Sequence, residues 1–239
     1  MKLYTIGCSF TEGQGLDNHH NECYSHILSE NLDTKHFNFG ACGASNDYIF
    51  RKIFELLNSN IITKDDIIVI QWTHYMRKEL PIVYDDKEFY HFLPTTFYPY
   101  NDKIITSYGP NNELVTNKYI QNESLDEIKK IIENENKEFL NIYNLKFLNE
   151  EYQINTTKNY INSLYAYLEH FGYKHIHFFG WDSCIIDGIV DNSNFLKETF
   201  GGFSHIDFSQ SKLIRHPNKN EHENWANFLY KKIKLNYNL

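Results

Sequence analysis

Residues 66–72 are the segment that most narrowly limits the fold. They read DIIVIQW, so four consecutive branched apolar residues stand together without any alternation of polar and apolar positions. Such a run is typical of a strand that is covered on both faces, as the central strands of parallel sheets are. The chain is therefore expected to form an α/β structure, with helices on both faces of a mainly parallel sheet.

The remaining pattern alternates between strands and helices. Short β-rich runs at residues 3–7, 36–39 and 175–179 precede turns that contain glycine, and a fainter strand signal lies at 212–214. Helical spacing of apolar residues follows expected caps at Asn21, Ser45 and Asn218, and it also marks residues 157–171, which Gly172 closes. This order predicts repeated βα units.

The chain is expected to form a single domain over residues 1–239, with an insertion at about 84–150. Between residues 85 and 122 the periodicity fades into Pro, Tyr, Asn and Gly, and SLDE at 124–127 has the spacing of a capping box. Long segments of this kind are often lids or binding loops. The insertion is expected to shape a substrate pocket or to form an oligomer contact.

Composition excludes several classes of function. A net charge of −8 without basic runs argues against a non-specific nucleic-acid or anionic-membrane binder. No apolar run reaches the roughly 18 residues of a membrane span, and the N-terminus lacks the regions of a signal peptide. The four cysteines have no paired spacing, which favours reduced thiols. We therefore expect a cytoplasmic protein.

Ser9 is the first candidate for chemistry. The segment GCSFTEG, residues 7–13, follows the first strand, so Ser9 stands at the carboxyl end of that strand. Open α/β sheets bind their ligands at this edge. Free backbone N–H groups in the turn that follows would favour a developing negative charge there.

Three segments resemble conserved blocks of the SGNH (GDSL) hydrolases, and a fourth stands at the place of a block from which it departs. Residues 7–13 are similar to block I, with Cys8 in place of the usual Asp, and residues 38–46 are similar to block II, whose glycine falls on Gly43. Residues 71–74 occupy the place of block III, but its Asn position is Thr73. The His216–Pro217 pair, just before the last helix, resembles block V.

The resemblance implies a flavodoxin-like, three-layer α/β/α sandwich with a mainly parallel five-stranded sheet in the order 2-1-3-4-5. It also implies that Ser9 is the nucleophile, that His216 is the general base, and that the N–H groups of Ser9 and Gly43 form the oxyanion hole together with Thr73. Pro217 independently biases His216 towards an extended loop, away from the helical region. Such a histidine is what a serine nucleophile needs.

The family usually carries an aspartate two or three residues before this histidine. Here Leu213 and Ile214 stand at those positions. Three alternatives remain: Asp182 or Asp207 orients the imidazole ring, a backbone carbonyl does so, or the site is weakened.

Four other residues carry secondary hypotheses. Trp72 either packs in the core or contacts substrate, and Arg77 either binds an anionic substrate group or forms an ion pair with a carboxylate such as Glu79. His175 and His177 share one face of a strand, as two metal ligands would, but no third ligand has a recognisable spacing. A metal is therefore not expected. His222 is expected to be exposed on the last helix.

The sequence thus predicts a serine ester hydrolase that cleaves an acyl ester or a carbohydrate O-acetyl ester, needs no cofactor, and acts on a small molecule or a glycan. The alternative is a catalytically weak or inactive module on the same fold, which binds a glycan or serves as an assembly component.

Overall fold

The computed structural model describes residues 1–84, 87–93, 149–203 and 216–239. Its elements in chain order are β1 (Lys2–Gly7), α1 (Ser9–Glu12), α2 (His19–Glu22), α3 (Tyr24–Asn31), β2 (Lys35–Gly40), α4 (Asn46–Asn58), β3 (Ile67–Trp72), β4 (Lys78–Tyr84), β5 (Lys87–Leu93), α6 (Glu150–Phe171), β6 (Lys174–Phe179), η2 (Asp182–Cys184), α7 (Phe200–Phe203) and α8 (Lys219–Tyr237).

The central sheet has the order β2-β1-β3-β6, and every pair in it is parallel. This confirms the predicted α/β class and agrees with the first four strands of the expected 2-1-3-4-5 order. The faint strand signal at residues 212–214 lies outside the described residues. At the outer edge of β6, His177 instead exchanges backbone hydrogen bonds of 2.8 Å with Asn194 and Leu196.

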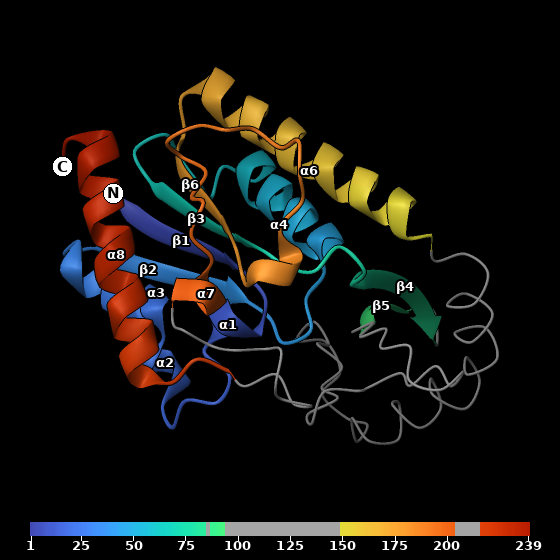
Figure 1. Ribbon diagram of the computed structural model, residues 1–239, viewed down its shortest axis with the longest axis horizontal. Helices are drawn as coiled ribbons and strands as arrows, with labels where there is room; N and C mark the ends of the chain where they lie inside the picture. The colour runs from blue at the N-terminus through green and yellow to red at the C-terminus, as the bar shows by residue number, and fades with distance from the viewer. Residues whose placement is uncertain (85–86, 94–148, 204–215) are drawn as a thin grey trace.

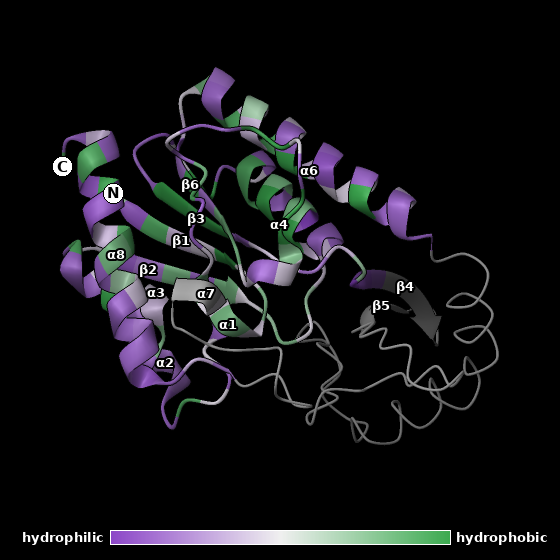
Figure 2. Cartoon of the chain, viewed as in Figure 1, coloured by the Kyte–Doolittle hydropathy of each residue, from purple (hydrophilic) through white to green (hydrophobic). Residues whose placement is uncertain are grey.

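The strand β3 lies in the middle of the molecule. All six of its residues are buried, as its unbroken apolar run predicts. Helices α4 and α6 cover one face of the sheet, and α3 and α8 cover the other (Figure 1). Figure 2 shows the consequence: the strands are largely hydrophobic, whereas α6 and α8 carry many hydrophilic residues. Two helical layers therefore enclose the sheet.

The helix boundaries follow local capping chemistry. Ser45 accepts a hydrogen bond from the Tyr48 amide, and Asn218 forms a full capping box with Glu221, both as expected. Gly172 ends α6 in the left-handed conformation, also as expected. In contrast, α6 begins at Glu150 and not at residue 157, because Asn149 caps it. The helix expected after Asn21 begins only at Tyr24.

Most of the expected insertion, including the capping box at 124–127, lies outside the described residues, so its role stays a prediction. The described part near it is an antiparallel hairpin of β4 and β5. All four cysteines are free thiols. Among the described helices, none is both long enough and apolar enough to cross a bilayer.

Candidate active site

Ser9 lies where β1 ends and α1 begins, at the carboxyl edge of the sheet. Cys8 has an extended backbone and accepts from the amides of Thr11 and Glu12, which closes the first turn directly after the strand. The first amides of a helix have no acceptor within the helix. The Ser9 amide is therefore well placed to donate to an anion.

The short helix α1 can lie close to the ends of β1 and β2 only because glycines stand there. A Cβ atom on Gly40 would lie 2.3 Å from the backbone nitrogen of Glu12, and one on Gly7 would lie 2.2 Å from Thr11 Oγ1. Neither distance leaves room for a side chain. These two glycines therefore set the position of Ser9.

His216 lies next to Ser9, although 207 positions separate the two residues in the sequence. Its Nε2 atom lies 3.0 Å from Ser9 Oγ, within the range expected for a nucleophile and its base. The imidazole packs edge-on against Phe10, with 5.5 Å between ring centroids. A Cβ atom on Gly15 would lie 3.1 Å from His216 Cβ, so the glycine turn after α1 lies directly against this residue.

The environment of His216 favours its neutral form. Burial, followed by the positive charge of Arg77, lowers the pKa of His216 to about 4. The ring is thus uncharged near neutral pH and can accept a proton. A low pKa also makes it a weak base, because the driving force for proton transfer falls with basicity.

Gly43 and Thr73 lie on the same edge of the sheet as Ser9. Gly43 belongs to the turn after β2 and has a positive φ of 75°, a conformation that favours glycine. Thr73 directly follows β3 and is fully buried. Its hydroxyl has no hydrogen-bond partner among the described residues. A buried hydroxyl without a partner is costly, so this group is a candidate donor to a ligand.

Two amide side chains that sequence reasoning did not assign hold this edge together. Asn46 bonds the backbone of Thr73. Gln71 accepts from Thr11 Oγ1 at 2.5 Å and donates to Cys8 Sγ at 3.1 Å, so it ties β3 to both sides of Ser9. The available signal was a glutamine inside an otherwise apolar strand, because a buried amide has to find partners.

The structure does not supply a carboxylate to His216 from the described residues. Asp182 is exposed in η2, and its Oδ1 atom accepts from Thr199 Oγ1 at 2.5 Å. No carboxylate of a described residue contacts the His216 ring. Asp207 lies outside the described residues, as do Leu213 and Ile214. Which group orients the ring therefore stays a prediction.

Trp72 and Arg77 differ in their accessibility. Trp72 is fully buried and donates from Nε1 to His177 Nδ1 at 3.1 Å. Its indole belongs to the core, which corrects the hypothesis that it contacts substrate. Arg77 is only partly buried, and its guanidinium lies over the Trp181 ring, 5.0 Å from the ring centroid.

Three other histidines, His175, His177 and His222, are fully buried. The rings of His175 and His177 lie 5.0 Å apart, and His175 Nε2 lies 3.1 Å from Glu169 Oε1. Among the described residues, no group of three or more His, Cys, Asp or Glu side chains could hold a metal ion. His222 is buried, contrary to expectation, because its ring packs against Phe200 and its Nδ1 accepts from the Tyr24 amide at 3.0 Å.

A cavity of about 490 Å³ lies elsewhere, between α3 and the start of β2. Lys35, one of its lining residues, pairs in register with Lys2 at the amino ends of the strands. This edge is opposite to the one that carries Ser9. The cavity is therefore separate from the Ser9–His216 site.

No protein-family model matches the chain, and no curated protein matches it. Among solved structures, the chain is similar to a protein assigned to the G-D-S-L family of lipolytic proteins from Desulfitobacterium hafniense DCB-2, with 11% identity, coverage of 97% of this chain and 98% of the other, and a TM-score of 0.36. It is also similar to the psychrotrophic esterase EstA from Pseudoalteromonas sp., with 10% identity, coverage of 100% and 99%, and a TM-score of 0.49.

Proposed function

We propose that this protein is a serine ester hydrolase of the SGNH type. The observation that carries the proposal is the 3.0 Å contact between Ser9 Oγ and His216 Nε2. The contact joins residues from the two ends of the chain at the edge where parallel sheets bind ligands. A serine beside a neutral imidazole is the arrangement that activates a hydroxyl as a nucleophile.

In the proposed reaction, Ser9 Oγ attacks the ester carbonyl while its proton passes to His216 Nε2. The C–O bond to the alcohol then breaks, and the imidazolium returns the proton to the leaving alkoxide. Water, deprotonated by the same nitrogen, then attacks the acyl carbon, the bond from that carbon to Ser9 Oγ breaks, and the imidazolium returns the proton to Ser9 Oγ, which releases a carboxylic acid. The amides of Ser9 and Gly43, with the Thr73 hydroxyl, stabilise the oxyanion.

We expect this hydrolase to be slow. The hydroxyl of Thr73 replaces the amide of the usual asparagine and has a shorter reach, so it should recover only part of the about 3 to 4 kcal/mol that one donor of an oxyanion hole typically contributes. The low pKa of His216, caused by burial and by Arg77, weakens the base as well. A small or activated ester, or a glycan O-acetyl ester, suits such a site.

The test is labelling with a fluorophosphonate probe, wild type against Ser9→Ala, because the probe reports an activated serine for any natural substrate. We expect wild-type protein to be labelled and to hydrolyse p-nitrophenyl acetate, and both signals to be lost in Ser9→Ala and greatly reduced in His216→Ala. Folded wild-type protein without either signal would refute the hydrolase and favour the binding module.

A further inference from the structure

Arg77 is a cation beside the site for which the described residues provide no counter-ion. It lies in the turn that follows β3, where its own amide donates to the His74 carbonyl at 3.0 Å. The Nη1 atom is buried and has no hydrogen-bond partner among the described residues. The residue as a whole is only partly buried, so it keeps some surface exposed to solvent.

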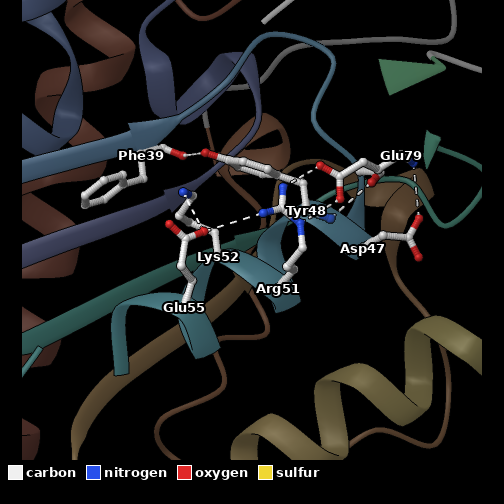
Figure 3. A network of polar contacts seen from close by, with 8 residues as sticks. Phe39, Asp47, Tyr48, Arg51, Lys52, Glu55 and Glu79 are labelled. Carbon is white, nitrogen blue, oxygen red and sulfur yellow. Dashed lines mark hydrogen bonds and ion pairs between the residues drawn. The ribbon is translucent and has the colours of Figure 1, made fainter. Parts of the chain in front are cut away.

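The carboxylate expected to pair with Arg77 has another partner. Glu79, on β4, accepts two hydrogen bonds from Arg51 of α4, at 2.6 Å from Nη2 and 3.1 Å from Nε. Figure 3 shows this pair together with Lys52 and Glu55. Asp47 is also engaged, by Lys78 at 3.2 Å. The structural ion pair between Arg77 and Glu79 is therefore not formed.

A partly buried cation with a buried N–H group that has no acceptor is costly. Its removal from water is compensated only when an anion or an acceptor replaces the lost hydration. Stacking on Trp181 offsets part of this cost, because a guanidinium over an aromatic face is attracted by the ring. The contact with the ring does not supply a hydrogen-bond acceptor, so Nη1 still lacks one among the described residues.

A chain of ring contacts connects this guanidinium with the catalytic base. The centroid of Trp181 lies 5.2 Å from that of Phe10, which lies 5.5 Å from that of His216. The electrostatics agree, since after burial the charge of Arg77 is the next cause that lowers the pKa of His216 and that of His74, each to about 4. Arg77 is therefore near enough to act on a bound ester.

Resting on the proposed ester hydrolysis, we propose that Arg77 selects esters that carry an anionic group, a carboxylate or a phosphate, near the scissile bond. The planar guanidinium matches such oxyanions, and Trp181 holds its plane in place. The substrate class is thus an anionic ester, with the charge on either the acyl or the alcohol side.

The experiment compares two pairs of esters. On the alcohol side, 3-acetoxybenzoate is matched by the uncharged 3-acetoxybenzamide, and on the acyl side, mono-4-nitrophenyl succinate is matched by 4-nitrophenyl butyrate. We expect wild-type protein to prefer the anionic member of at least one pair in kcat/KM, mainly through a lower KM. Arg77→Gln should reduce that preference by about 10-fold to 100-fold, as lost hydrogen bonds to a charged group do.

Two further variants sharpen the comparison. Arg77→Lys keeps the charge but not the planar fork, so it should restore only part of the preference. Arg51→Gln removes a nearby arginine that contacts Glu79 and does not stack on Trp181, and it should leave the preference unchanged. Equal losses on charged and uncharged esters in Arg77→Gln would indicate a structural or transition-state role and overturn the inference. A wild-type enzyme without any preference would do the same.

A binding measurement separates this inference from the proposed function. If Ser9-dependent turnover exists without a charge preference, the inference fails and the hydrolase stands. If no ester is hydrolysed and no serine is labelled, calorimetry on Ser9→Ala protein decides instead. Binding of 3-acetoxybenzoate at least 10-fold tighter than the benzamide, and lost in Ser9→Ala/Arg77→Gln, supports the inference, and equal binding refutes it.

The pH dependence gives a readout that a structural role would not change. A bound carboxylate neutralises the charge of Arg77, so His216 should have a higher pKa in the complex than in the free enzyme. For the preferred anionic ester, the kcat profile should therefore lie at higher pH than the kcat/KM profile. For its uncharged partner, the two profiles should coincide. Coincident profiles for both esters would contradict the inference.

Discussion

The side chain of Asn46 forms two hydrogen bonds of 2.9 Å with the backbone of Thr73, one as donor and one as acceptor. The Thr73 amide donates to Asn46 Oδ1, and Asn46 Nδ2 donates to the Thr73 carbonyl. The first residue of α4 thus fixes the backbone that leaves β3. The position of the Thr73 hydroxyl therefore depends on the amide side chain of Asn46.

Asn46→Ala should lower both stability and activity. The variant leaves a buried amide and a buried carbonyl without their partners, at about 1 to 3 kcal/mol each. We expect a lower midpoint in urea and a reduced kcat on p-nitrophenyl acetate. Asn31→Ala, which removes an exposed amide contact to Asn227, is the control and should change stability by less than about 0.5 kcal/mol. Similar stability in both variants would contradict the role of Asn46.

Thr73→Val should separate stability from activity. The change keeps the shape of the side chain but removes a buried hydroxyl that has no partner among the described residues. Stability should stay equal or rise, since no hydrogen bond is lost. If the hydroxyl donates to the oxyanion, kcat should fall by about 10-fold to 100-fold with little change in KM. An unchanged kcat would remove Thr73 from the oxyanion hole.

The pH profile of kcat/KM should report His216 as a base with a low pKa. Burial and Arg77 lower this pKa to about 4, so the ring is already neutral at pH 6. Activity on p-nitrophenyl acetate should be nearly constant from about pH 6 to 8 and should fall as the pH approaches 4.

Arg77→Gln should move that fall to higher pH. Removal of the positive charge favours the imidazolium, while burial still opposes it, so the new midpoint should lie between about 4 and the ordinary value of 6.5. A wild-type midpoint near 6.5, or one that Arg77→Gln does not change, would contradict the electrostatic description of the site.

Gly40→Ala should displace Ser9. The new Cβ atom would lie 2.3 Å from the backbone nitrogen of Glu12, which α1 can relieve only by moving. We expect slower fluorophosphonate labelling and reduced stability. Gly172→Ala is the control, because a Cβ atom there meets nothing within 4 Å and only the positive φ of 72° is unfavourable. It should cost about 1 to 2 kcal/mol without changing the labelling rate of the folded protein.

The sequence was sufficient for those features that depend on local chemistry. The apolar run of β3 predicted a buried central strand, and the small residues after β1 predicted the position of Ser9 at the carboxyl edge. Pro217 predicted that His216 precedes the last helix, which begins at Lys219. In each case a short segment determines its own conformation, whatever the rest of the chain does.

Other features depend on partners that are distant in the sequence. The sequence around His222 is polar and suggests an exposed helix residue, but contacts with Tyr24 and Phe200, both distant in the sequence, bury it. Glu79 is two residues from Arg77, yet it pairs with Arg51 on α4. Asn46 follows a helix cap and gives no local sign that it bonds the segment after β3. Such pairings follow from the topology and not from spacing.

The bond from the Tyr24 amide to His222 Nδ1 spans 198 positions, and the contact from His216 to Ser9 spans 207. The nucleophile and its base therefore meet only while α8 is docked against α3. Local opening of this helix pair would separate them although the sheet stayed intact. Ser9 reactivity would then disappear before the circular dichroism signal of the sheet changes. The reaction rate therefore reports whether α8 is docked against α3.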